Sequence, residues 1–213
     1  MAKEEQKWID DVYRNTPLEE IPWNNEAPPK LLVELLDTGK IQRCKAIDLG
    51  CGAGNYAIYL AERGFEVTGV DLSLAAIEIA RKNADKRGVK CDFFVTDVVE
   101  GLTEINQTFD FAYDWGMLHH ILPQQRKKYV ENIYRILNPG GKYLSLCFSK
   151  KDTGFGGSGK YRKTRLDTEL YFSSEEELRK LFEDFFHIID LRTLKIDGKF
   201  EPHIFNYAFM ERK

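Results

Sequence analysis

Lys45-Ala46-Ile47-Asp48-Leu49-Gly50-Cys51-Gly52-Ala53-Gly54-Asn55-Tyr56 is the stretch that decides the fold. It begins with a short apolar run interrupted by one acid, continues with glycines at alternate positions, and passes into an amphipathic pattern. This order predicts a strand, a tight turn and the N-terminus of a helix. Glycine lets the backbone approach a ligand closely, and the free N–H groups at a helix start suit a negatively charged group. The stretch therefore indicates a nucleotide-type cofactor site.

The composition is that of a globular chain with one core. Its 213 residues suffice for a single domain, and 43% are hydrophobic and 31% charged. The net charge of −3 does not indicate binding to nucleic acids or to membranes. No apolar run approaches the roughly 20 residues that cross a bilayer, and residues 1–7 lack the apolar core of a signal peptide. We therefore expect a cytoplasmic protein without nucleic-acid or membrane partners.

The cysteines give no sign of a metal site or a disulfide framework. The chain has four, and none forms a Cys-x-x-Cys pair. They are Cys44, Cys51, Cys91 and Cys147. Free thiols in a reducing compartment are the ordinary state of such cysteines, so we predict no bound metal.

Strand and helix patterns alternate through the first two thirds of the chain. The expected strands cover residues 46–49, 65–70, 91–95, 109–115 and 142–148, and the expected helices cover 55–63, 74–87 and 123–137. Such alternation implies right-handed crossovers and a parallel sheet with helices on both faces.

The C-terminal part follows a different pattern. Residues 150–165 are rich in glycine and basic residues, so we expect a loop there. Ser174 and Glu177 form a capping-box pair for the next helix. Strands at 188–194 and 204–210 are joined by a loop too short for a crossover, so they must be antiparallel. The predicted fold is α/β, a doubly wound, mostly parallel seven-stranded sheet with an antiparallel last strand and helices on both faces.

A separate helical segment precedes the sheet. Helices are expected at 3–16 and 30–37, the second beginning just after two prolines. We therefore divide the chain into an N-terminal helical cover, residues 1–40, and a cofactor-binding domain, residues 41–213.

Two cofactor classes use a glycine turn after a first strand, the dinucleotides and S-adenosylmethionine. The dinucleotide fingerprint is Gly-x-Gly-x-x-Gly, whereas Asn55 stands here where the third glycine belongs. An acid, Asp48, also lies within the strand end. Both facts disfavour a dinucleotide. Asp71 follows the second strand, 23 residues after Asp48, and its carboxylate can accept ribose hydroxyls in either class.

A P-loop is the third candidate. Residues 154–160 fit Gly-x-x-x-x-Gly-Lys, but Tyr161 stands where a magnesium-binding serine or threonine is required. No convincing amphipathic helix follows. A loop beside the active site is the better interpretation of this segment.

Several motifs together resemble the class I S-adenosylmethionine-dependent methyltransferases over roughly residues 40–213. The matching stretches are Asp48-Leu49-Gly50-Cys51-Gly52-Ala53-Gly54, Val67-Thr68-Gly69-Val70-Asp71, Thr96-Asp97-Val98, Phe109-Asp110 to Asp114-Trp115-Gly116, and Leu137-Asn138-Pro139-Gly140-Gly141. The resemblance implies an enzyme that binds S-adenosyl-L-methionine and releases S-adenosyl-L-homocysteine. It also implies a set of cofactor-binding residues, namely Asp48, Gly50, Cys51, Gly52, Asn55, Asp71, Leu72, Asp97, Val98, Asp114, Trp115 and Gly116.

The chemistry of this cofactor agrees with those residues. S-adenosylmethionine has a sulfonium, an amino-acid tail, a ribose and an adenine, and no phosphate, so the glycine turn makes room for the amino-acid moiety. Asp48 can form an ion pair with the ammonium group. The resemblance gives Asp71 the ribose and Asp97 the adenine amino group. Leu72 and Val98 either contact the adenine faces or simply pack in the core.

Residues for the methyl acceptor are sought near the cofactor's methyl group. His119 and His120 follow Gly116 closely, and a histidine there could take a proton from a substrate; the alternative is a packing role. Tyr13 and Trp23 are candidates for a substrate wall or for plain packing. The Pro22-Trp23 element resembles the N-terminal covers of the thiol, halide, thiopurine and tellurite methyltransferases, which implies a small, soft nucleophile.

The sequence thus predicts methyl transfer to a small molecule by in-line displacement, which gains mostly from holding the nucleophile near the methyl group. It needs no strong base if the nucleophile is a thiolate or halide. Two other functions remain open, a non-catalytic module that binds S-adenosylmethionine and a dinucleotide-dependent oxidoreductase. A monomer or a homodimer is expected.

Overall fold

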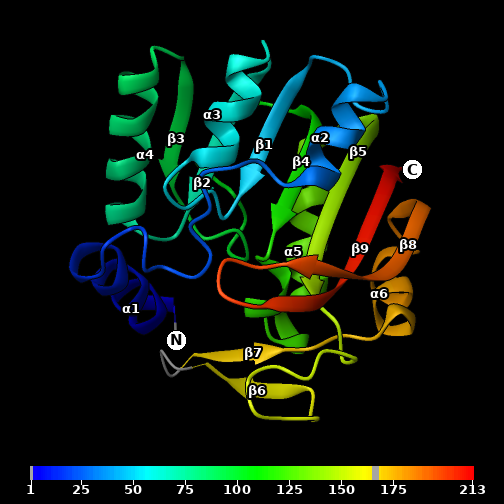
Figure 1. Ribbon diagram of the computed structural model, residues 1–213. Coiled ribbons are helices and arrows are strands. Elements are labelled where there is room, and N and C mark those ends of the chain that lie inside the picture. Colours follow the sequence, from blue (N-terminus) through cyan, green and yellow to red (C-terminus); the bar gives the residue numbers. More distant parts are fainter. Residues whose placement is uncertain (1, 165–167) are drawn as a thin grey trace.

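One seven-stranded sheet organises the computed structural model, which describes residues 2–164 and 168–213. Its strand order is β3-β2-β1-β4-β5-β9-β8 (Figure 1). The strands are β1 (Lys45–Leu49), β2 (Glu66–Asp71), β3 (Cys91–Val95), β4 (Phe109–Trp115), β5 (Leu137–Phe148), β8 (Phe186–Asp197) and β9 (Pro202–Arg212). β1 to β5 pair in parallel, and β9 is antiparallel to both β5 and β8. The predicted fold class is confirmed.

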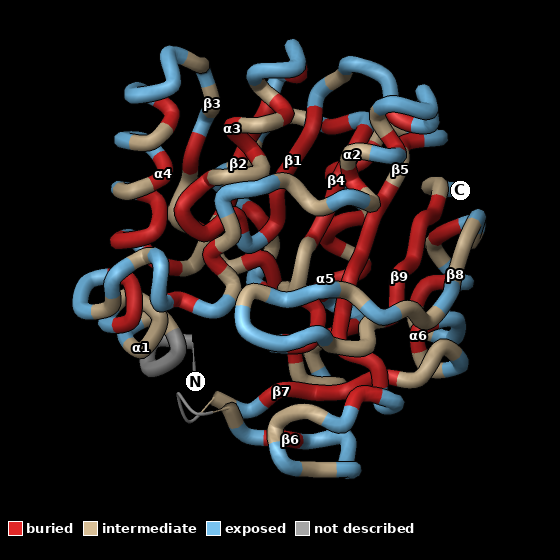
Figure 2. The backbone as a smooth tube through the Cα atoms, viewed as in Figure 1, coloured by how far each residue is buried: buried red, intermediate tan, exposed pale blue. Residues whose placement is uncertain are grey.

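Helices cover both faces of the sheet. They are α1 (Ala2–Asn15), α2 (Lys30–Asp37), α3 (Asn55–Glu62), α4 (Leu74–Arg87), α5 (Pro123–Ile136) and α6 (Glu175–Phe182), with a 3₁₀ turn, η1 (Leu118–His120). The strand side chains alternate between two buried clusters, one shared with α2, α3 and α4 and the other with α5 and α6. Figure 2 shows the resulting buried strands between more exposed helix faces. The predicted helix caps at Ser73 and at Ser174 with Glu177 are confirmed.

The strand order reverses between β1 and β4. From β1 the chain proceeds through α3 to β2 and α4 to β3, whereas β4 and β5 lie on the other side of β1. Open α/β sheets bind ligands in the crevice outside the strand ends at such a point, which here means the carboxyl ends of β1 and β4. The glycine turn after β1 lies at this point. Gly50, Gly52 and Gly54 there have φ of 76°, 53° and 80°, a region that favours glycine.

The first strand of a two-stranded hairpin lies in the segment expected to be a loop, and the second strand follows that segment. Its strands are β6 (Tyr161–Lys163) and β7 (Glu169–Tyr171); residue 165, the last of the expected loop, lies outside the described residues. The buried residue of β6 is Arg162, whose guanidinium donates to the carbonyls of Asp152 and Gly154 and lies 3.9 Å above the Phe172 ring. Because a charged residue fills the buried position, the sequence carries no apolar strand pattern there.

Both the N-terminal helix and the β6–β7 hairpin lie at the edge where β1, β4 and β5 end (Figure 1). α1 packs on the start of α4, where Asp10 Oδ1 accepts from the Ser73 hydroxyl (2.5 Å) and from the Ala75 N–H (3.0 Å). α2 contributes Leu32 and Leu35 to the cluster under α3 and α4. Among the described residues, no helix is long and apolar enough to span a membrane.

Candidate functional site

Asp48 is a buried carboxylate in need of a partner. It lies at the end of β1 with 3% of its surface exposed, and its Oδ2 has no hydrogen-bond partner among the described residues. Burial raises the pKa of this carboxyl to about 7. An unpaired charge in such a place is unfavourable, so the site suits a cation brought by a ligand.

Asp71 ties the second strand to the glycine turn. Its Oδ2 accepts from the Gly52 N–H and its Oδ1 from the Ser73 N–H, both at 2.9 Å. Each carboxylate oxygen has two acceptor positions, so one on each oxygen is left for a diol. The Asp71 carboxylate could therefore accept hydrogen bonds from two ribose hydroxyls.

The adenine-side candidates follow β2 and β3. The Thr96 N–H donates to the Asp71 carbonyl (3.0 Å), which places the β3 end beside the β2 end. Oδ1 of Asp97 accepts from the Val99 N–H (2.8 Å). Leu72 is partly exposed, whereas Val98 belongs to the buried cluster under α5. Of the two apolar candidates, Leu72 is therefore the better placed to contact a ligand.

Asp114 has a different role from the one expected. Its Oδ2 accepts from the hydroxyls of Tyr143 (2.6 Å) and Tyr129 (3.3 Å), and its Oδ1 accepts from the N–H groups of Met117 and Leu118 (3.3 Å each). These four bonds use all four acceptor positions of the carboxylate. Direct binding of the cofactor by this side chain is therefore not supported, and Asp114 instead fixes the turn after β4.

The other two predicted residues of this segment, Trp115 and Gly116, lie at the carboxyl end of β4 and directly after it. Trp115 is partly exposed and packs edge-on against Tyr56 with the ring centroids 6.4 Å apart. Gly116 has a φ of 99°. The turn after β4 also packs closely against the glycine turn after β1. A Cβ placed on Gly50 would lie 2.9 Å from Sδ of Met117.

Tyr13 and Trp23 lie at the glycine turn rather than at a separate substrate wall. Trp23 Nε1 donates to the Tyr13 hydroxyl (2.9 Å). A Cβ placed on Gly52 would lie 2.5 Å from that hydroxyl oxygen, so only glycine leaves room for Tyr13. Burial raises the pKa of Tyr13 well above its ordinary value, which keeps the phenol neutral.

Asn55 and Cys51 complete the turn. Asn55 Nδ2 donates to Oδ1 of Asn24 (2.9 Å) and to the Asn25 carbonyl (3.0 Å), so its amide nitrogen holds the N-terminal segment. Cys51 is buried, and burial raises the pKa of its thiol well above the usual range. In the part of the chain that the structure describes, no group of three or more His, Cys, Asp or Glu side chains could hold a metal ion.

His119 lies in η1, the turn after β4. Only 6% of it is exposed, and its Nδ1 accepts from the Phe148 N–H (3.4 Å). A Cβ on Gly116 would lie 3.7 Å from its Nε2. Burial lowers the pKa of His119 well below its ordinary value, and His120, Arg126 and His203 lower it further. His120 itself is exposed, with its ring centroid 4.8 Å from that of His119.

Comparison with known proteins agrees with this geometry. A family model described as a methyltransferase domain matches residues 46–141, from the first strand to the glycine pair in β5. A solved structure from work on the conversion of a disulfide bond into a thioacetal group during echinomycin biosynthesis has a TM-score of 0.83 and 27% identity, covering 98% of this chain and 92% of that one. The chain is a class I S-adenosylmethionine-dependent methyltransferase.

Curated relatives of this methyltransferase carry different acceptor names. The 2-heptyl-1-hydroxyquinolin-4(1H)-one methyltransferase of Mycobacteroides abscessus is 29% identical over 154 residues, which are 70% of this chain and 67% of that protein. The tRNA N(3)-methylcytidine methyltransferase Mettl2 of Drosophila melanogaster is 30% identical over 165 residues, 71% of this chain and 51% of that protein. The chain thus matches only about half the length of the second relative. Similarity alone leaves the acceptor open.

The residues of the methyltransferase fit its cofactor, S-adenosylmethionine. The unpaired Asp48 oxygen suits the ammonium group, and the remaining acceptor positions of Asp71 suit the ribose hydroxyls. When bound, this cofactor supplies an electrophilic methyl group. These residue roles remain predictions.

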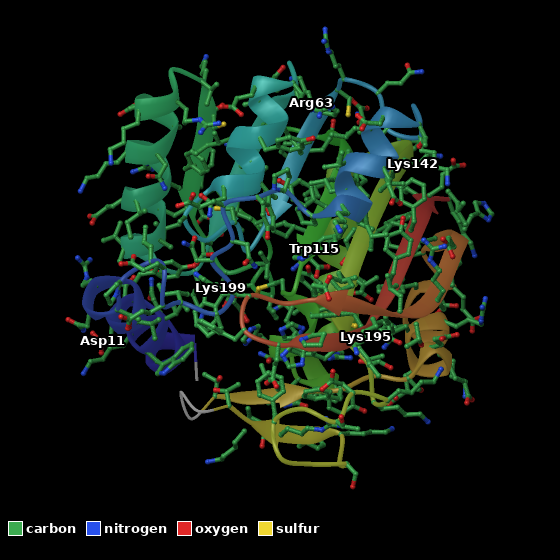
Figure 3. All side chains as sticks on the ribbon, viewed as in Figure 1. Asp11, Arg63, Trp115, Lys142, Lys195 and Lys199 are labelled. Carbon is green, nitrogen blue, oxygen red and sulfur yellow. The ribbon has the colours of Figure 1, made fainter. Side chains whose placement is uncertain are left out.

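Two cations that hold segments around the site were not predicted from the sequence. Lys199, at the tip of the β8–β9 hairpin, donates to the carbonyls of Leu18 (3.3 Å), Ile21 (3.2 Å) and Asn24 (2.9 Å). Figure 3 shows Lys199 beside the N-terminal segment. Arg126, in α5, is a buried cation beside η1. Lys199 lies in an ordinary polar loop and Arg126 lies in a helix with many charges. The sequence pattern therefore does not distinguish either residue from its neighbours.

Proposed function

We propose that this methyltransferase transfers the methyl group to a small molecule whose accepting atom is a soft, easily ionised nucleophile such as a thiol. The observation that carries this proposal is the position of the N-terminal strap, residues 17–25, which is bonded to the glycine turn at one side and to the β8–β9 hairpin at the other. Lys199 holds the strap from the hairpin side and Asn55 holds it from the glycine turn. A strap held in this way beside the glycine turn favours a compact acceptor over a macromolecule.

The chemistry near Gly116 supports a nucleophile that needs little activation. His119 is the described imidazole closest to this position, and its lowered pKa makes it a weak base. Displacement at a sulfonium methyl gains chiefly from holding the nucleophile close and in line. The related structure from echinomycin biosynthesis concerns sulfur chemistry, and the Pro22-Trp23 resemblance to thiol and halide methyltransferases points the same way.

A screen of acceptors tests the proposal. Release of S-adenosylhomocysteine would be measured with thiols, halides, phenols and amines, and with transfer RNA as a macromolecular control. We expect turnover with one or more thiols and none with transfer RNA. Binding of S-adenosylmethionine without methyl transfer to any acceptor would instead favour the non-catalytic module, and turnover of transfer RNA alone would refute a small acceptor.

A further inference from the structure

The tautomer of His119 is fixed by its neighbour in β5. A backbone N–H can only donate, so the bond from the Phe148 N–H requires an unprotonated Nδ1. A neutral imidazole then carries its proton on Nε2. Among the described residues that nitrogen has no hydrogen-bond partner, and it lies on the Gly116 side of the ring. His119 therefore presents a hydrogen-bond donor, and not a base, to the crevice.

Arg126 gives the same region a positive field. The guanidinium is 5% exposed and donates to the carbonyls of Ile121 (2.7 Å) and Leu118 (2.9 Å) and to the Ser173 hydroxyl (2.6 Å). Within residues 2–164 and 168–213, no carboxylate lies at ion-pair distance from it. A buried cation without a counter-ion acts strongly on nearby groups and favours an anion there.

The ionisable groups around His119 come from all the elements that pack on η1. They are His120 on η1, Asp114 on β4, Arg126 on α5, Cys147 on β5, Tyr171 on β7 and His203 on β9. Asp114 has no acceptor position left. Asp152, beside His203, accepts from the N–H groups of Ile204 (2.5 Å) and Gly154 (2.7 Å). These hydrogen bonds hold both carboxylates in place, and Arg126 is the permanent cation among the groups around His119.

We propose that the acceptor is bound as an anion, a thiolate or a phenolate, that accepts a hydrogen bond from the Nε2–H of His119. This inference rests on the proposed function. The thiol or phenol loses its proton to solvent as it enters, because the donor and the cation both stabilise its anion. The nucleophile's lone pair then forms the bond to the methyl carbon, and the electron pair of the broken carbon–sulfur bond stays on the cofactor's sulfur. No proton passes to His119.

Nitrogen NMR tests the tautomer without any turnover. The full chain, labelled with ¹⁵N-histidine and saturated with S-adenosylhomocysteine, would be followed from pH 5.5 to 9, with His119→Gln to assign the signal. We expect the Nε2–H form of His119 throughout, with no titration. An Nδ1–H form, or protonation within this range, would overturn the donor role.

A matched pair of ligands tests the charge. At pH 8 thiophenol is mostly ionised and phenol is mostly neutral, while the two have similar shapes. We expect thiophenol to shift the His119 Nε2 signal at a concentration at least tenfold below that needed for phenol. If the two ligands shift the signal at equal concentrations, or if thiophenol gives no shift, the anion site is refuted.

Substitution separates this inference from the proposed function. With an acceptor from the screen, His119→Gln, which keeps an N–H donor near the Nε2 position, should retain most of kcat, whereas His119→Ala should lose at least tenfold. Both should keep the wild-type pH profile. If the wild-type profile of kcat against pH has a limb that is absent in His119→Gln, His119 acts as a base. If the screen yields no acceptor, the proposed function fails, while the NMR results still decide whether His119 is a donor.

Discussion

At the scale of single residues, the unpaired carboxylate of Asp48 makes cofactor binding depend on pH. The ammonium group of the cofactor needs the ionised carboxylate, whose pKa is about 7 in the free protein. Affinity for S-adenosylhomocysteine should therefore rise from pH 5.5 to about 7. Calorimetric titration across this range measures it. Asp48→Asn should bind more weakly and lose the pH dependence, and an unchanged slope in that variant would contradict the assignment.

The same residue makes stability fall with rising pH in the cofactor-free protein. The carboxyl has a pKa of about 7 when folded and about 3.9 when unfolded. Between these values the folded state holds a proton that the unfolded state has released, so the free energy of unfolding decreases as pH rises. The loss is on the order of a few kcal/mol. Urea denaturation at pH 5 and pH 8 should show it in the wild type, and Asp48→Asn should show less of it.

Gly52 is required because of a close approach. In Gly52→Ala the new Cβ would meet the Tyr13 hydroxyl at 2.5 Å, besides the strain of a positive φ. Gly88 is a matched control, since it has a φ of 66° and open space around it. We expect Gly52→Ala to destabilise the protein by about 1–3 kcal/mol more than Gly88→Ala, measured by urea denaturation. Addition of Tyr13→Phe should recover part of the difference; no recovery would exclude the clash with the hydroxyl.

The place of a residue in the site was predictable where it depends on residues nearby in the sequence. Asp48, the glycines and Asp71 follow directly from strand ends and a turn, and their positions agree with expectation. Asp114 differs, because its four donors come from the turn after β4, from α5 and from β5. Which way a carboxylate turns at a strand end depends on such partners, and a strand pattern does not contain them.

At the scale of elements, Lys199 connects the β8–β9 hairpin to the strap at residues 17–25. Removing its ammonium in Lys199→Met takes one donor from each of three carbonyls, of which those of Leu18 and Ile21 still accept from Asn24. We expect faster amide hydrogen exchange in residues 17–25 and a stability loss of about 1–3 kcal/mol. Lys195→Met is the control, because Lys195 is an exposed residue of the same β8–β9 hairpin (Figure 3). Equal exchange in the two variants would show that the strap does not depend on Lys199.

Regular elements were predicted well because periodicity and capping are local. β3, β4 and α2 have the expected bounds, and α6 begins at the expected capping box. β5 begins earlier than expected, since Leu137 pairs with Phe109 before a bulge near Gly140 and Gly141. The β6–β7 hairpin was missed because its buried residue is Arg162, which is stabilised by carbonyl oxygens and not by apolar contacts.

At the scale of the whole molecule, the ends of the chain build the site together. The strap and Lys199 are separated by about 175 residues in sequence and meet over the glycine turn. The hairpin at β6–β7 closes the other side of the same sheet edge (Figure 1). The sequence predicted the sheet and its switch point, but contacts of this separation leave no periodic signal. Local motifs therefore gave candidate residues for the cofactor, whereas the contacts around the acceptor join segments that are far apart in sequence.

The central claim is that the crevice between β1 and β4 binds S-adenosylmethionine through Asp48 and Asp71. Calorimetric titration of the full chain with S-adenosylhomocysteine, and separately with NAD, tests it most directly. We predict saturable one-site binding of S-adenosylhomocysteine, at least tenfold weaker in Asp71→Ala, whose fold is verified by circular dichroism, and no binding of NAD. Affinity unchanged in Asp71→Ala, or binding of NAD in place of S-adenosylhomocysteine, would contradict the claim.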